Sequence, residues 1–176
     1  MVAYHDTEWG VPVHDDCKHF EYLVLDAFQA GLSWSTVLNK RENFRKAFDN
    51  FNPDVIAHYT RRKVNSLLND AGIIRNRLKV ESTITNAQMF LELQDHEGSF
   101  DTFVWQFVGG QTRQNRWRTL KQLPVCTAQS DAMSKALKKR GFRFTGSTTC
   151  YACMQAAGLV IDHVTSCLRH AQIRNM

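Results

Sequence analysis

The chain reads DDCKHFEYLVLDAFQAGLSWSTVLN over residues 15–39, and this stretch decides the class of fold that we expect. Its apolar residues recur at the three- and four-residue spacing of a helix that begins at one of the two opening aspartates. Gly31 predicts the end of that helix, and Ser33 is a typical N-cap for a second helix that opens with Trp34. The apolar positions are Phe20, Leu23, Val24, Ala27 and Phe28.

One acidic residue, Asp26, lies inside this apolar run. Tyr22 and Gln29 share its helix face, because residues three and four apart are neighbours on a helix surface. With Trp34 after the turn, these side chains are typical of one wall of a small pocket. These residues are also compatible with no pocket at all, since an acid near a helix end is usually solvated and a Trp after a turn is usually in the core.

Composition indicates a folded protein with a polyanionic partner. The 176 residues suffice for one domain or two small lobes that share a core, and 43% of them are apolar. No apolar run is long enough for a membrane helix and no signal-peptide pattern is present, so we expect a cytoplasmic protein without membrane contact. Five cysteines argue against a disulfide framework. A formal charge of +5 favours nucleic acid, although many basic proteins bind none.

Helical patterns fill most of the remaining chain and predict an all-α fold, with almost no strand signal and no repeat. The opening residues 4–12 are aromatic and without period, which predicts an ordered arm rather than a helix. Residues 109–127 are the least regular and read only as a basic loop. Further helices are expected over 34–48, 53–58, 61–69, 78–93, 100–107, 131–140 with Ser130 as its cap, 147–157 and 162–170.

A second candidate site lies where two helical patterns meet at Gly72, which Ile73 follows. Such a hairpin exposes backbone N–H groups at the start of its second helix, where the helix dipole favours an anion. Arg75, Arg77 and Lys79 add positive charge beside that point. These features are what a grip on DNA phosphates requires, independent of base sequence. A plain pair of antiparallel helices with a glycine stop and a solvated basic face explains them equally well.

Two groups of cysteine and histidine are candidates for metal binding. His163 and Cys167 are four residues apart and would share one helix face, and His5 could supply a third ligand by joining the two ends of the chain. Most such pairs bind no metal. Cys150 and Cys153 match a Cys-x-x-Cys motif but lie within an apolar helical pattern, which favours two buried small residues.

Tyr4, Trp9 and Trp34 form an aromatic set that we expect near Asp26. Ring faces attract cations, and a carboxylate adds negative charge, so the set suits a flat cationic ligand. A methylated purine base fits this description.

The chain resembles the bacterial DNA-3-methyladenine glycosylase I family, and the resemblance extends in order over nearly its whole length. It is therefore far more specific than any single motif. The matching segments are Tyr4-His5-Asp6, Glu8-Trp9-Gly10-Val11-Pro12, Gln29-Ala-Gly-Leu-Ser-Trp34, Lys40-Arg-Glu-Asn43, Asp70-Ala-Gly-Ile-Ile-Arg75, Ser134-Lys-Ala-Leu-Lys-Lys-Arg-Gly-Phe142, Met154-Gln-Ala156 and Asp162-His-Val164.

The resemblance implies a bacterial base excision repair enzyme with the helix-hairpin-helix glycosylase fold. Residues 1–176 would form a single monomeric domain of two closely packed helical lobes, with its termini together and a DNA grip at about 60–80. Its partners would be alkylated double-stranded DNA and free 3-methyladenine, and it would need no nucleotide cofactor. The implied roles are Asp26 as the catalytic carboxylate, Tyr4, Trp9, Trp34 and Gln29 in the base pocket, Leu32 as a wedge in the duplex, Gly72, Ile73, Arg75 and Arg77 on the DNA backbone, and His5, His163 and Cys167 as zinc ligands.

Three positions depart from the family pattern. Asp26 stands where the family has a glutamate that is one methylene longer, and Ala152 stands where it commonly has a serine. The family's fourth zinc ligand is a cysteine that precedes the position of His5. Either the true start lies upstream of Met1, or the metal is absent, or water fills an open position.

Two other classes of function remain as alternatives. One is a damaged-DNA binding module that has lost turnover through the changes at Asp26 and Ala152. The other is a small-molecule binder for cationic purines, which would have no use for the Gly72 hairpin and its basic residues. Salt-sensitive DNA binding is expected of the glycosylase and of the binding module but not of the small-molecule binder, so it separates the last from the other two.

Overall fold

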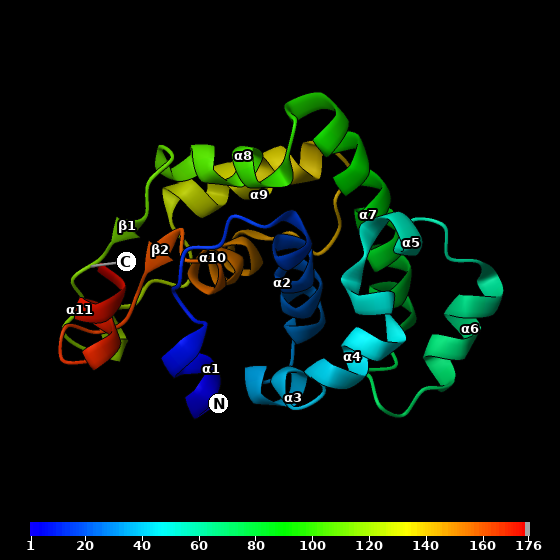
Figure 1. The fold of residues 1–176 in the computed structure, drawn as a ribbon, viewed down its shortest axis with the longest axis horizontal. Coiled ribbons are helices and arrows are strands. Elements are labelled where there is room, and N and C mark those ends of the chain that lie inside the picture. The colour runs from blue at the N-terminus through cyan, green and yellow to red at the C-terminus, as the bar shows by residue number, and fades with distance from the viewer. Residues whose placement is uncertain (175–176) are drawn as a thin grey trace.

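The computed structural model describes residues 1–174 and confirms the mostly helical fold, with helices arranged around a central helix, α2 (Figure 1). The helices are α1 (Val2–Thr7), α2 (Asp16–Gln29), α3 (Trp34–Leu38), α4 (Arg41–Ala47), α5 (Pro53–Ile56), α6 (Arg61–Asn69), α7 (Arg77–Glu97), α8 (Phe100–Trp105), α9 (Ala128–Lys139), α10 (Ser147–Ala156) and α11 (Leu168–Arg174). Short 3₁₀ turns span Asp49–Phe51, Gln106–Val108 and Leu120–Gln122.

Helix α2 holds the fold together because it is buried along most of its length. Its N-cap, Asp15, accepts a hydrogen bond of 2.7 Å from the amide of Lys18, as the sequence predicts. The helix packs against α3, α7, α8 and α10. It ends before Gly31, whose φ of +81° lies in the left-handed region that favours glycine.

One continuous apolar core extends to both sides of α2. Figure 1 shows α4, α5, α6 and α7 on its right and α1, α10 and α11 on its left. Stacked aromatic rings fill part of this core, such as Phe44 on Phe48 and Phe90 on Phe100. No helix within residues 1–174 is long and apolar enough to span a membrane.

At four helix starts after α2 a side-chain cap is present, and one of the four is the predicted cap Ser33. In each case the side-chain oxygen of the cap accepts a bond from a backbone amide of the first turn, which satisfies a donor that the helix leaves free. The four caps are Ser33, Asn52, Thr60 and Ser99.

Several sequence expectations about helices are wrong in detail. The opening arm contains a helix, α1, whose six residues are too few to show a helical period. The helix expected over 34–48 is divided into α3 and α4, and the long helix expected over 78–93 continues to Glu97. Helix α9 is capped by Thr127, and the Ser130 hydroxyl instead accepts a hydrogen bond from the Thr127 amide in a capping box.

The C-terminal region differs most from its sequence pattern. The helix expected over 162–170 begins only at Leu168, because residues 162–167 form a loop and turn. Directly before this loop, β2 (Val160–Ile161) pairs in parallel with β1 (Arg113–Gln114). Strands of two residues are too short to show an alternating pattern, so they could not be predicted from the residues.

Candidate functional site

A cavity of about 380 Å³ opens between α1, the end of α2, the start of α3 and the C-terminal loop. It collects most of the pocket residues that the sequence analysis singled out. These are Tyr4, His5, Trp9, Asp26, Gln29, Trp34, His163 and Cys167, joined by Met1, Leu120, Ala152, Gln155, Asp162 and Val164, which the sequence analysis assigned no role in this pocket.

Asp26 is the acid of this cavity, and only 4% of its surface is exposed. Burial raises the pKa of its carboxyl to about 7, while a hydrogen bond with the Cys153 thiol acts in the opposite direction. Its Oδ2 has no hydrogen-bond partner among the described residues. A buried carboxylate oxygen without a partner is costly for stability, so Asp26 is suited to accept a hydrogen bond from a ligand.

Aromatic rings enclose the cavity on two sides. The rings of Tyr4 and Trp34 contact each other with centroids 5.3 Å apart, and the ring of Trp9 stands edge-on to His163 at 4.6 Å. The indole N–H of Trp34 is buried and has no acceptor within residues 1–174. The site thus offers apolar faces together with the Trp34 N–H as a donor and the Asp26 Oδ2 as an acceptor.

The turn between α2 and α3 forms one edge of the cavity. The side-chain amide of Gln29 donates to the Leu32 carbonyl oxygen at 2.9 Å and fixes this turn. The Leu32 side chain remains 40% exposed. A large apolar side chain held outward beside a cavity is what the wedge role would require.

Asp162 anchors the opposite wall through four hydrogen bonds. Its Oδ1 accepts from Asn115 and Trp117, both at 2.7 Å, and its Oδ2 accepts from Tyr151 at 2.6 Å and Gln155 at 2.7 Å. The irregular segment 109–127 is therefore ordered against the pocket. Sequence reasoning missed this because its donors lie far apart in the chain and carry no shared motif.

A buried ion-pair network holds the N-terminal arm against the helices. Arg41 pairs with Glu8 of the arm and with Glu21 of α2, at 2.9 and 2.8 Å. Burial tends to raise the pKa of Glu21, but hydrogen bonds from Arg41 and Lys18 lower it to about 2. This network fixes the arm that carries Tyr4, His5 and Trp9.

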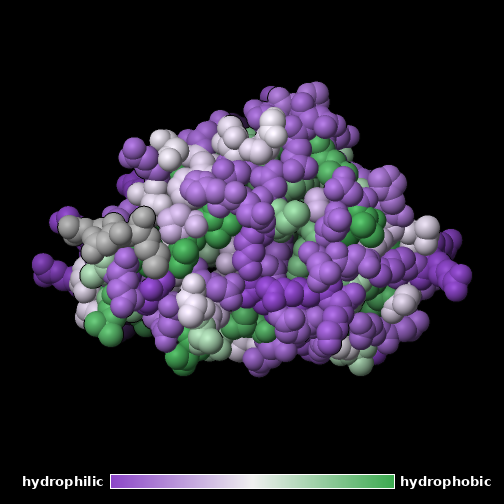
Figure 2. Space-filling view, in the orientation of Figure 1, coloured by the Kyte–Doolittle hydropathy of each residue, from purple (hydrophilic) through white to green (hydrophobic). Residues whose placement is uncertain are grey.

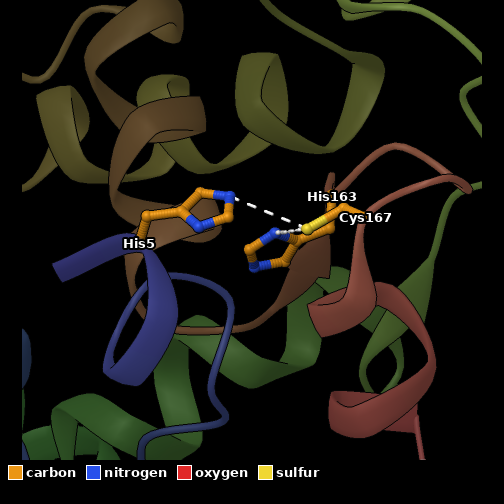
Figure 3. Close-up of side chains that lie close together, drawn as sticks. All are labelled: His5, His163 and Cys167. Carbon is orange, nitrogen blue, oxygen red and sulfur yellow. Dashed lines mark hydrogen bonds between the residues drawn. The ribbon is translucent and has the colours of Figure 1, made fainter. Parts of the chain in front are cut away.

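In the wall of the cavity, His5, His163 and Cys167 bring their ligand atoms within 4.8 Å of one another (Figure 3). The Cys167 Sγ lies 3.5 Å from His163 Nδ1 and 3.9 Å from His5 Nε2. Tetrahedral zinc with ordinary bond lengths separates a sulfur and a nitrogen ligand by about 3.5 Å. The expectation that His163 and Cys167 share a helix face is wrong, because a turn brings them together instead.

Hydrogen bonds behind the two histidines orient them for metal binding. His163 Nε2 donates to the Trp9 carbonyl oxygen at 2.9 Å, and His5 Nδ1 donates to the Asp6 carboxylate at 2.7 Å. Each bond leaves the other ring nitrogen free to face Cys167, which is the usual arrangement behind zinc-bound histidines. Three ligands with this support fit a zinc ion.

The loop between α6 and α7, residues 70–76, is the hairpin loop of the sequence analysis. The space around its glycine is tight, since a Cβ on Gly72 would lie 2.9 Å from the Asp70 carboxylate and 3.3 Å from the Asn43 side chain. Lys40 donates to the carbonyl oxygens of Ala71 and Gly72 at 3.0 and 3.2 Å. The Gly72 amide is bonded to Asp70 at 2.7 Å, so it is not among the exposed N–H groups that we expected.

The residues of this hairpin loop and the helix after it divide into exposed and buried side chains. Arg75 and Arg77 are exposed, and Arg77 pairs with Glu81 at 3.3 Å. The Ile73 side chain lies in the core. The expectation that Lys79 adds charge to a DNA-binding face is wrong, because its ammonium is directed inward to the backbone at the end of α2.

Comparisons with known proteins agree with these features. The family model described as methyladenine glycosylase matches residues 1–170. The chain is 51% identical to DNA-3-methyladenine glycosylase 1 of Escherichia coli strain K12, over 94% of this chain and 89% of the relative. A crystal structure of 3-methyladenine DNA glycosylase I is similar, with a TM-score of 0.93 at 50% identity over 95% of this chain and 92% of that one. A Staphylococcus aureus enzyme, solved to explain 3-methyladenine recognition, is also similar, with a TM-score of 0.93 at 33% identity over 95% and 89%.

Proposed function

Since the chain belongs to the methyladenine glycosylase family, we propose that it hydrolyses the N-glycosidic bond of 3-methyladenine in alkylated DNA, a step of base excision repair. One observation carries this proposal within the structure. The Asp26 carboxyl lies buried at an aromatic cavity, and its Oδ2 has no hydrogen-bond partner within residues 1–174.

Substrate selection follows from the charge of the damaged base. Methylation at N3 leaves the purine ring cationic, so the Asp26 carboxylate offsets its charge and accepts a hydrogen bond from the exocyclic amine. The rings of Tyr4, Trp9 and Trp34 supply faces for a flat cation, and Gln29 holds the turn at the edge of the pocket. A neutral purine would leave the carboxylate without a partner charge.

The reaction needs little from the protein in the way of proton transfer. The bond between purine N9 and sugar C1′ breaks, and its electron pair moves to N9 and neutralises the cationic ring. The oxygen of a water adds to C1′ and the water loses a proton. The leaving base is already activated by its charge, so the role of Asp26 is to recognise the extruded base and hold it in the pocket.

Double-stranded DNA would be held by the hairpin loop as a helix-hairpin-helix grip at about residues 60–80. The exposed side chains of Arg75 and Arg77 would meet phosphates, and the main chain around Gly72 and Ile73 would approach the DNA backbone. Leu32 would enter the duplex where the nucleotide has left it. We further propose that one monomeric domain, built of two packed lobes, performs the whole reaction.

We also propose a structural zinc ion bound by His5, His163 and Cys167. Their ligand atoms and supporting hydrogen bonds fit this metal. When bound, zinc supplies a cross-link between the N-terminal helix and the C-terminal loop, both of which line the cavity.

A test of the proposed function is the release of free bases from methylated duplex DNA. Chromatography of the supernatant is expected to show 3-methyladenine and no unmodified adenine. Tight binding of the methylated duplex without any released base would contradict the proposal and favour the damaged-DNA binding module.

A further inference from the structure

We propose that residues 113–121, here called the basic segment, form a second DNA contact across the pocket from the hairpin loop. Its cations would bind phosphates on one side of the extruded nucleotide, and Leu120 would pack against the nucleotide at the mouth of the cavity. This inference rests on the proposed glycosylase function and adds a cationic surface beside the candidate site, since none of the four cations of the segment lines the cavity.

The positive charge of the basic segment is not paired with acidic side chains in the described part of the chain. Arg113, Arg116, Arg118 and Lys121 all have exposed side chains. Within residues 1–174, no acidic group lies at ion-pair distance from any of them. The sequence contains no aspartate or glutamate between residues 101 and 131. Four cations gathered without a counter-charge suit an external polyanion.

The backbone of the basic segment is fixed rather than loose. Its first two residues form β1, which pairs with β2 beside the cavity. The Trp117 indole donates to Asp162 at 2.7 Å, and the Trp117 carbonyl accepts from the Thr165 amide at 2.8 Å. A surface that is ordered before binding loses less entropy when it meets its ligand.

Leu120 connects the basic segment to the pocket. It lines the cavity and is nevertheless 75% exposed. A capping box between Thr119 and Gln122 holds it at the start of a 3₁₀ turn. Figure 2 shows apolar residues gathered along the lower left edge of the molecule, in the region of the N-terminus and α11. A large apolar side chain exposed at a pocket mouth suits contact with a base or sugar.

The two DNA contacts would flank the pocket. In Figure 1, β1 lies at the left and the connection from α6 to α7 lies at the lower right, with α1 and α3 between them. Duplex DNA laid along this edge would meet cations on both sides of the cavity. The hairpin loop alone would hold only one side of the extruded nucleotide.

The experiment compares salt dependence of duplex DNA binding for two triple variants of equal charge. One variant carries Arg116→Gln, Arg118→Gln and Lys121→Gln in the basic segment. The matched control carries Lys135→Gln, Lys138→Gln and Lys139→Gln on α9, whose side chains are also exposed and which lies at the upper edge of the molecule in Figure 1. Fluorescence anisotropy with an unmodified duplex gives the slope of log affinity against log salt.

The proposal predicts that the basic-segment variant loses about 0.9 of slope for each phosphate contact removed, while the control keeps the wild-type slope. Equal slopes in both variants would overturn it. Base release by the wild type, measured in parallel, tests the glycosylase function separately. Normal base release by the wild type, together with unchanged salt slopes in the variants, would reject only the proposed DNA contact of the basic segment. No base release, together with a reduced slope in the basic-segment variant, would reject only the glycosylase function.

A second variant tests the position of Leu120. Leu120→Ala is expected to lower the affinity for a duplex carrying an abasic-site analogue several-fold. Val125→Ala removes a side chain of similar exposure that does not line the cavity, and it should leave this affinity unchanged. Equal affinities for the two variants would show that Leu120 does not meet the DNA.

Discussion

The ammonium group of Lys79 donates a hydrogen bond of 2.6 Å to the carbonyl oxygen of Ala30. A second bond of 2.8 Å reaches the carbonyl of Phe28. Lys79 lies in the first turn of α7, directly after the hairpin loop, and Ala30 closes α2 before the turn that carries Leu32. The proposed DNA grip and the proposed wedge are thereby tied into one rigid unit.

Lys79→Met is expected to destabilise the protein by about 2 kcal/mol, because two backbone carbonyl oxygens at the end of α2 lose their charged donor. The melting temperature should fall by about 4–8 °C. Lys135→Met, at an exposed position on α9, is the control and should melt close to the wild type. A Lys79 variant as stable as this control would contradict the structural role.

Leu32→Ala is expected to reduce base release from methylated duplex DNA about tenfold, because the gap in the base stack is no longer filled. Release from methylated single-stranded DNA should stay near the wild-type rate, since no stack has to be opened. Val55→Ala, at a residue of similar exposure on α5, should change neither rate. A parallel loss on both substrates would mean that Leu32 serves the pocket and not the duplex.

Cys167→Ser is expected to abolish zinc binding and to lower the melting temperature by at least several degrees, because the cross-link between the chain ends is lost. Metal content by atomic spectroscopy should fall from one zinc per chain to none. Cys126→Ser, at a cysteine outside the metal cluster, serves as the control. Equal metal content in both variants would exclude this cluster as the zinc site.

Asp26 is expected to make the stability of the protein depend on pH. Burial raises the pKa of its carboxyl to about 7, whereas an unfolded chain has a value of about 3.9. Between these values the folded state holds a proton that the unfolded state lacks, so the free energy of unfolding falls as the pH rises.

Asp26→Asn removes the ionisable group and with it the loss of stability at rising pH. The variant should therefore gain about 2–3 kcal/mol relative to the wild type between pH 5 and pH 8, as measured by urea denaturation at each pH. Asp131→Asn, at an exposed carboxylate, is the control. A constant difference between wild type and Asp26→Asn across this range would show that the folded pKa is not raised.

The central helix and its turn were predictable because their signals are local. The apolar period of α2, the Asp15 cap and Gly31 all act within a few residues of one another. The direction of Lys79 was not predictable, because an inward ammonium depends on carbonyl groups 49 and 51 positions away. Local patterns report helices, whereas long-range partners decide which charges face the solvent.

The candidate site also has a part that could be predicted from the sequence and a part that could not. The aromatic residues and Asp26 entered the prediction through residue types and through the family resemblance, and the structure gathers them at one cavity. The four hydrogen bonds to Asp162 were missed, because Asn115 and Trp117 lie in a segment without regular structure. Only the folded chain brings that segment to the pocket, where Leu120 lines the cavity.

The role of Asp26 is tested most directly by the rate of 3-methyladenine release from methylated duplex DNA by the wild type, Asp26→Asn and Asp26→Glu. Asp26→Asn is expected to lose about 100-fold in rate, because the charge facing the cationic base is gone. Asp26→Glu keeps the carboxylate and should remain active, and all three proteins should bind an unmodified duplex equally. Release by Asp26→Asn at the wild-type rate would contradict the central role of this carboxylate.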